Sequence, residues 1–201
     1  MNQAQRKIVQ YLQQARAMEL GLERAMQEQA ATAPPGSYRG AMEAHLVQTR
    51  EHAMRIQTRL SQLGSWSGPL RLGLDLLERI LTQTVAVGRR PLELLSGVST
   101  EEKVLKSARD TCVNEATEIA TYTALERLAR SLGDRETASL AASILSEEQA
   151  MLERLLIEIP KLTEGVVRAE VRGEPAYVLA EGTALDTPAA WRGRSTERAI
   201  A

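Results

Sequence analysis

The sequence predicts an all-α protein, a four-helix bundle in which two helical hairpins are joined by a long crossover. Three observations favour this class. Leu, Ala, Glu, Arg and Gln dominate the 201 residues, strand-like alternation is nearly absent, and apolar residues recur at steps of three and four. Breaks that contain glycine or proline separate the apolar stretches, so each stretch is expected to form a helix of its own.

The first hairpin is predicted from residues 2–31 and 38–63. Glu19 interrupts the apolar stripe of the first helix at its middle. The sequence Ala-Pro-Pro-Gly at residues 33–36 then breaks the helix, and Ser37 is the expected N-cap of the second. A short break of this kind predicts two antiparallel neighbours.

A long connection, residues 64–100, is expected to contain a shorter helix over residues 70–87. The third helix begins at Ser99, which has capping-box spacing to a glutamate three residues later. It ends near Leu132, and after one glycine Asp134 is the expected N-cap of the fourth helix. The long helical crossover between helices 2 and 3 lets the chain pass from one end of the bundle to the other.

Composition narrows the classes of function. The net charge is -1, which gives no basic footprint for nucleic acid. The sequence shows no signal-peptide pattern and no apolar run of membrane-spanning length, so a cytoplasmic protein without a membrane partner is expected. Cys112, the single cysteine, excludes an internal disulfide and a cysteine-based zinc site, and it is expected to be a small buried apolar residue.

Acidic and histidine side chains interrupt the apolar stripes at one level. Glu19, His52, Glu115 and Glu148 each fall about 14 residues into a helix, which is about 20 Å from the helix start, and Glu118 flanks Glu115 one turn on. Antiparallel packing would bring these midpoints into one layer. Two hairpins with a long crossover are the ferritin-like arrangement, in which inward Glu and His bind two iron or manganese ions.

Several motifs of the predicted core belong to a known bacterial pattern. They are Glu115-x-x-Glu118-Ile119-Ala120-x-Tyr122, then Leu132-Gly133 and Glu147-Glu148, and more weakly His45-Leu46-x-x-Thr49 and Glu19. With these motifs the chain resembles the YciE/YciF ferritin-like proteins, which are stress-associated proteins with a dimetal site and an assumed ferroxidase role. The resemblance implies an iron or manganese site, and the matching positions are Glu19, His52, Glu115, Glu118 and Glu148.

Two positions depart from that family pattern. Gln48 stands where the family usually has Glu, and Leu152 stands where the fourth helix often has another acidic residue. Gln48 and Tyr122 are therefore candidates for a weak ligand or for a neighbour of the ligands. Two interpretations stay open: a dimetal protein with ferroxidase or peroxidase-like chemistry, and a non-catalytic stress-response bundle that acts through assembly or partner binding.

The inward acidic and histidine side chains also have simpler interpretations that involve no metal. The inward carboxylates could be half-exposed or paired with Arg109, Arg127 or Arg154. His45 lies about two turns from His52 and is expected to cap or pack rather than to ligate. Glu147 is expected outside the cluster, solvated or paired.

The C-terminal residues change character. Glycine and proline punctuate residues 164–201, so residues 1–163 are predicted to form the bundle and the remainder an irregular arm or extension. The arm is expected to pack on its own bundle or on a second subunit of a homodimer or higher homo-oligomer. The alternative is that it docks to a larger assembly, such as a protein shell.

Overall fold

The structure, a computed structural model, describes residues 1–65 and 99–174. These residues form four long helices and one short π-helical segment, and no strand occurs within them. The elements are α1 (Gln3–Thr32), α2 (Ser37–Gln62), α4 (Thr100–Ser131), α5 (Arg135–Val166) and η2 (Val167–Arg172). The predicted all-α four-helix class is confirmed. In the described ranges, no helix is both long and apolar enough to cross a membrane.

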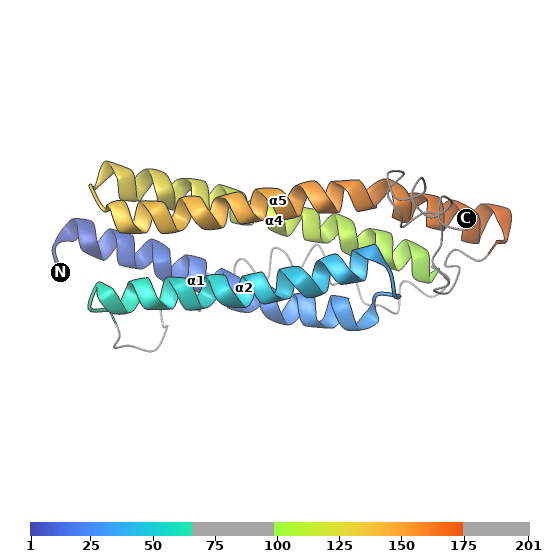
Figure 1. The fold of residues 1–201 in the computed structure, drawn as a ribbon, viewed down its shortest axis with the longest axis horizontal. Coiled ribbons are helices and arrows are strands. Elements are labelled where there is room, and N and C mark those ends of the chain that lie inside the picture. Colours follow the sequence, from blue (N-terminus) through green and yellow to red (C-terminus); the bar gives the residue numbers. More distant parts are fainter. Residues whose placement is uncertain (66–98, 175–201) are drawn as a thin grey trace, which may run out of the picture.

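The helices lie side by side along one axis, as two hairpins stacked on each other (Figure 1). α1 packs against α2 and α4 against α5, and the hairpins meet through α1 with α4 and α2 with α5. Each of these neighbouring pairs is antiparallel (Figure 1). The crossover helix expected over residues 70–87 and the arm beyond residue 174 lie outside the described part of the chain. α5 itself continues past the predicted boundary at residue 163.

The turn of the first hairpin differs from prediction in one residue. Gly36 is the N-cap of α2, with φ of 153°, a conformation that favours glycine, and Ser37 is the first helical residue. The Ser37 hydroxyl instead donates a hydrogen bond of 2.7 Å to the Glu158 carboxylate of α5. The serine therefore ties the first hairpin to the second rather than capping its own helix.

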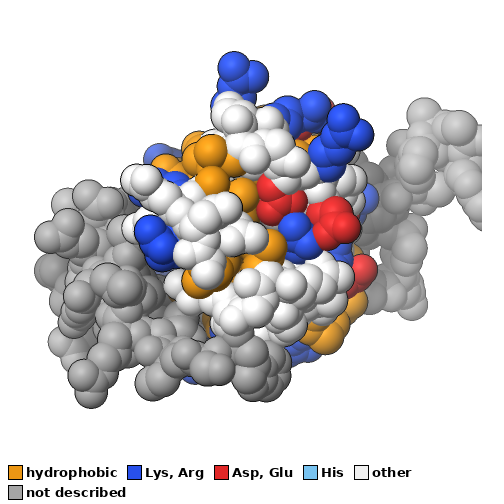
Figure 2. Space-filling model, turned by 90° about the vertical axis from the view of Figure 1, so that its left-hand side faces the viewer, with side chains coloured by type: hydrophobic (Ala, Val, Ile, Leu, Met, Phe, Trp, Pro, Cys, Tyr) orange, Lys and Arg blue, Asp and Glu red, His pale blue; other side chains and the backbone are white. Residues whose placement is uncertain are grey.

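The turn of the second hairpin follows the predicted chemistry. Asp134 accepts a hydrogen bond of 2.9 Å from the backbone N–H of Thr137, and Gly133 has a positive φ of 77°. Arg59, in the last turn of α2, donates to Asp134 at 2.7 Å and to the Thr137 hydroxyl at 2.9 Å. This contact fixes the end of one hairpin against the turn of the other, at the end of the bundle where acidic and basic side chains lie next to one another on the surface (Figure 2).

The apolar core is divided into two clusters along the bundle axis. One contains Leu12, Ile56, Leu125 and Ile144, and the other contains Met26, Met42, Met151 and Leu155. In each helix a buried ionisable residue falls between a member of one cluster and a member of the other. The folded protein therefore holds a polar layer at mid-length with apolar packing above and below it.

The inner face of α4 needs one correction. Cys112 is only half-buried, whereas Thr111 and Glu118 are buried completely. A straight helix repeats every 3.6 residues. Residues next to those selected by alternating steps of four and three can therefore also face the core. Glu118 thus lies on the buried face with Glu115, not at its edge.

Candidate metal centre

The mid-length layer collects ionisable side chains from all four long helices. α1 contributes Glu19, α2 contributes His45 and His52, α4 contributes Glu115 and Glu118, and α5 contributes Glu148. All of these side chains are buried, with at most 1% of their surface exposed. The helix periodicity that buries their apolar neighbours also forces these polar residues inward.

The side chains form two overlapping groups, each able to hold a metal ion. In the first, ligand atoms of His45, Glu115, Glu118 and Glu148 lie within 4.8 Å of one another. In the second, the same holds for Glu19, His52 and Glu148. Glu148 belongs to both groups: its Oε2 lies 3.7 Å from His45 Nε2, and its Oε1 lies 2.8 Å from His52 Nδ1. A carboxylate in this position is suited to lie between two cations.

His45 lies in the cluster, where the sequence interpretation did not place it. Its Nε2 is 3.0 Å from Glu115 Oε1, and its ring is buried in the cluster rather than capping or packing elsewhere. The two histidines are seven residues apart, about 10 Å along a helix, and a single thin layer would not reach both. The cluster is instead elongated along the bundle axis. The shared helix face of His45 and His52 was the signal that could have assigned both.

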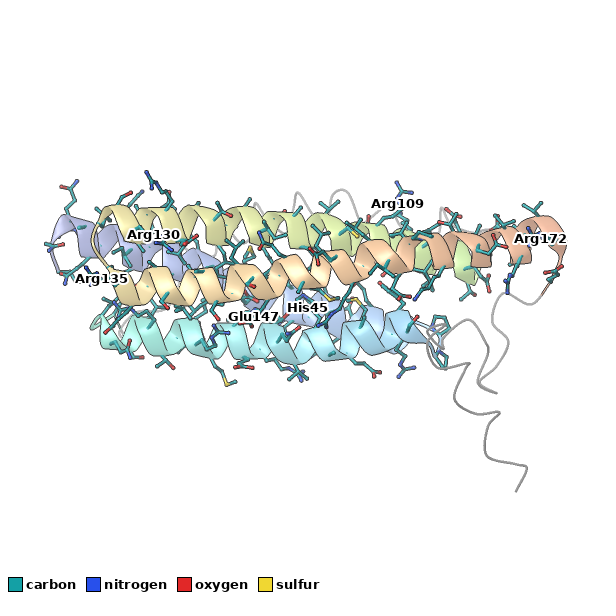
Figure 3. The ribbon with its side chains drawn as sticks, turned by 45° about the horizontal axis from the view of Figure 1, so that its top comes forward. His45, Arg109, Arg130, Arg135, Glu147 and Arg172 are labelled. Carbon is teal, nitrogen blue, oxygen red and sulfur yellow. The ribbon has the colours of Figure 1, made fainter. Side chains whose placement is uncertain are left out.

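His52 faces different carboxylates with its two ring nitrogens. Nδ1 points at Glu148 and lies 3.7 Å from Glu19 Oε1, while Nε2 lies 2.7 Å from Glu147 Oε2. Figure 3 shows the labelled His45 and Glu147 near mid-length, where α2 and α5 face each other. Glu147, expected to be solvated or paired, forms an ion pair with Arg55 as well.

Tyr122 contacts a candidate ligand directly. Its hydroxyl donates a hydrogen bond to Glu19 Oε1 from a position with no solvent exposure. This places Tyr122 as a neighbour of the ligands. Gln48 and Leu152, the two departures from the family pattern, are each only partly buried, unlike the fully buried residues of the cluster.

Burial and like charge shift the proton affinities of the cluster. Burial raises the pKa of Glu118 well above its ordinary value, and Glu19 and Glu148 add to the effect. Burial also raises the pKa of Glu115 to about 7, although His45 opposes the change.

The histidines shift in the direction that keeps them charged. Burial alone would lower the pKa of His52, but Glu148 and Glu19 outweigh it and raise that pKa to about 10. The pKa of His45 is raised in the same way, with Glu115 outweighing burial. In the metal-free protein, protons therefore reduce the repulsion among the carboxylates.

Most carboxylate oxygens of the cluster lack aligned hydrogen-bond donors in the part of the chain that the structure describes. Both oxygens of Glu115, Glu118 and Glu148 accept no aligned hydrogen bond from the residues described, and the 3.0 Å approach of His45 is short but not aligned. Within the same ranges no arginine pairs with them, and Arg109, Arg127 and Arg154 are exposed. The structural alternative of arginine pairing is thus not what the described residues show.

The donor set fits a cation. Buried carboxylate oxygens without aligned hydrogen bonds are costly, and a bound cation would offset that cost. Carboxylate and imidazole together suit manganese and iron. The cluster could therefore hold a metal ion.

Comparison with known proteins identifies the family. Residues 3–168 match the family described as a domain of unknown function (DUF892), and the chain belongs to it. The fold is also that of the Escherichia coli stress protein YciF, with TM-score 0.66 and 22% identity over 82% of this chain and 99% of that one. A protein of Xanthomonas campestris pv. campestris matches with TM-score 0.64 and 23% identity, over 85% and 99% of the two chains. These matches confirm the ferritin-like fold and the resemblance to the YciE/YciF proteins.

Proposed function

We propose that the chain is a dimetal-carboxylate protein that binds two iron or manganese ions in the mid-length cluster and handles oxygen or peroxide with them. One observation supports this most strongly. Glu148 lies between two Glu/His groups in the buried centre of the bundle, where neither oxygen of Glu115, Glu118 or Glu148 accepts an aligned hydrogen bond from the described residues. Ferritin-like bundles place paired metal ions in this way.

The residues divide between two positions. His45, Glu115 and Glu118 would hold one ion, His52 and Glu19 the other, and Glu148 would contact both. When bound, such ions supply the redox equivalents for ferroxidase or peroxidase-like chemistry. The apolar clusters on either side exclude water, and Tyr122 orients Glu19 through its hydrogen bond.

The two positions are not equivalent. The His45 position has two carboxylates of its own, and the His52 position has one. Because anionic ligands provide much of the attraction for a hard cation, we expect the His45 position to fill first and the His52 position to be weaker.

A second function is favoured by the departures at two positions. Gln48 adds no charge and Leu152 cannot ligate, so the site could be reduced in affinity and the bundle could act through assembly or partner binding instead. YciF is described as a stress protein. A stress role for this chain is part of the proposal in either form.

Anaerobic titration of metal-free protein with Mn(II) or Fe(II) separates the two functions. The dimetal proposal predicts two ions per chain, followed by consumption of oxygen or peroxide by the Fe(II) form. His52→Ala and Glu115→Ala should remove stoichiometric binding at their own positions. Glu43→Ala is the control, because it removes only an exposed pair with Arg39. No stoichiometric uptake by the unmodified protein would leave the non-catalytic function.

Gln48→Glu gives a second way to distinguish them. Gln48 is one helical turn from His52, so a new carboxylate there would approach the weaker position. The dimetal proposal predicts tighter Mn(II) binding. A variant that melts at lower temperature and gains no affinity would favour a metal-free polar core, because an added like charge raises the cost of the cluster.

A further inference from the structure

We propose that Glu147 is a positioning residue that fixes which ring nitrogen of His52 faces the metal cluster. This inference rests on the proposed dimetal function. Glu147 Oε2 lies 2.7 Å from His52 Nε2, while Nδ1 of the same ring lies 2.8 Å from Glu148 Oε1. The ring thus lies between one carboxylate of the cluster and one carboxylate outside it.

Glu147 is itself held in place from two helices. Arg55 of α2 donates to both of its carboxylate oxygens, at 2.9 and 3.1 Å, and Ser143 of α5 donates to Oε1 at 3.0 Å. The side chain is about one-third exposed, at 31%, while His52 is fully buried. A carboxylate anchored by an arginine in this way has little freedom to turn from the ring.

The consequence follows from imidazole chemistry. A neutral imidazole has one N–H and one lone pair, and an ionised carboxylate only accepts hydrogen bonds. With Glu147 on Nε2, the N–H must be at Nε2, which leaves the Nδ1 lone pair directed at the cluster. Such carboxylate partners orient metal-binding histidines and increase their basicity.

His45 provides an internal comparison. Its Nε2 faces Glu115, and its Nδ1 has no hydrogen-bond partner among the residues that the structure describes. Glu147 should therefore affect the His52 position and leave the His45 position nearly unchanged. Glu147 is expected from the sequence to be solvated or paired outside the cluster, without a named partner, and that expectation did not include its contact with His52.

The test compares Glu147→Leu, Glu147→Gln and Glu23→Leu. Leu removes the acceptor, whereas Gln keeps an acceptor oxygen without the charge. Glu23→Leu is the matched control, because Glu23 forms a similar partly buried pair between helices, 2.8 Å from Arg50, and contacts no histidine. Each metal-free protein is titrated with Zn(II), a diamagnetic probe, by calorimetry. Long-range ¹⁵N–¹H NMR of the loaded proteins then reports which His52 nitrogen is coordinated.

The unmodified protein should bind two Zn(II) ions and coordinate through Nδ1 of His52. Glu147→Leu should weaken the second binding step roughly 10–100-fold, leave the first step unchanged and lose exclusive Nδ1 coordination. Glu147→Gln should retain Nδ1 coordination with a smaller loss, and Glu23→Leu should match the unmodified protein.

Three results would overturn the inference. Two-ion binding with unchanged affinity and exclusive Nδ1 coordination in Glu147→Leu would reject the role of Glu147 alone. Equal losses in Glu147→Leu and Glu23→Leu would show a general effect of removing an interhelical pair. Failure of the unmodified protein to bind Zn(II) in the cluster would reject the proposed function, and the inference with it.

Discussion

Mn(II) binding at pH 7 should release protons from the cluster, because ligands must be deprotonated to bind metal. Burial raises the pKa of Glu118 well above its ordinary value and that of Glu115 to about 7. Glu148 and Glu19 overcome the opposing effect of burial and raise the pKa of His52 to about 10. At pH 7, His52 thus holds about one proton and Glu115 about half of one, and the raised pKa of Glu118 favours its protonated form. Full loading should therefore release roughly one to two protons per chain from His52 and Glu115, with any proton on Glu118 or His45 in addition.

Calorimetry in buffers of different ionisation enthalpy measures this number directly. The observed binding enthalpy should vary linearly with the buffer's ionisation enthalpy, with a slope equal to the number of protons released. Glu118→Gln should reduce the slope, since the amide cannot carry the proton that the buried carboxyl releases. Binding without any buffer dependence would refute the reasoning, because it would mean that the metal does not displace the cluster's protons.

Three further predictions concern stability. The metal-free protein should melt at progressively lower temperature as pH rises from about 5 to 9, because the folded protein keeps protons that the unfolded chain loses: Glu115 shifts upward from 4.5 and His52 from 6.5. Calorimetric scans that show a rising midpoint would contradict this sign. Glu118→Leu should raise the free energy of unfolding of the metal-free protein by about 1–3 kcal/mol in urea titrations, since it removes a buried carboxyl without partners; a lower value would indicate a stabilising role. Asp134→Ala should lower it by about 1–2 kcal/mol, because the α5 cap and the Arg59 contact are both lost; an unchanged value would mean that neither contributes.

Much of the fold could be predicted from local sequence. Breaks at glycine and proline, the caps at Ser99 and Asp134, and three-four apolar spacing place the described helices to within one or two residues at most ends. Ser37 failed as a cap because its hydroxyl bonds across the bundle to Glu158, a contact with a residue 121 positions away. No local pattern contains that information.

The sequence predicted where along the helices the candidate site lies better than it predicted which residues line the site. Counting residues from each helix start places the carboxylates at one height along the bundle axis. Because this count assumes that all site residues lie at that height, it left out His45. The bond between Tyr122 and Glu19 joins residues 103 positions apart, and that between His52 and Glu147 spans 95. Such contacts depend on how α1 packs on α4 and α2 on α5, which helix periodicity alone does not determine.

Anomalous diffraction from Mn(II)-soaked crystals tests the proposed dimetal centre most directly. Data collected near the manganese absorption edge should show two peaks at mid-length of the bundle, one beside His45 and one beside His52, with the Glu148 carboxylate between them. The absence of any peak within this cluster, or manganese bound only at surface carboxylates, would contradict the dimetal assignment.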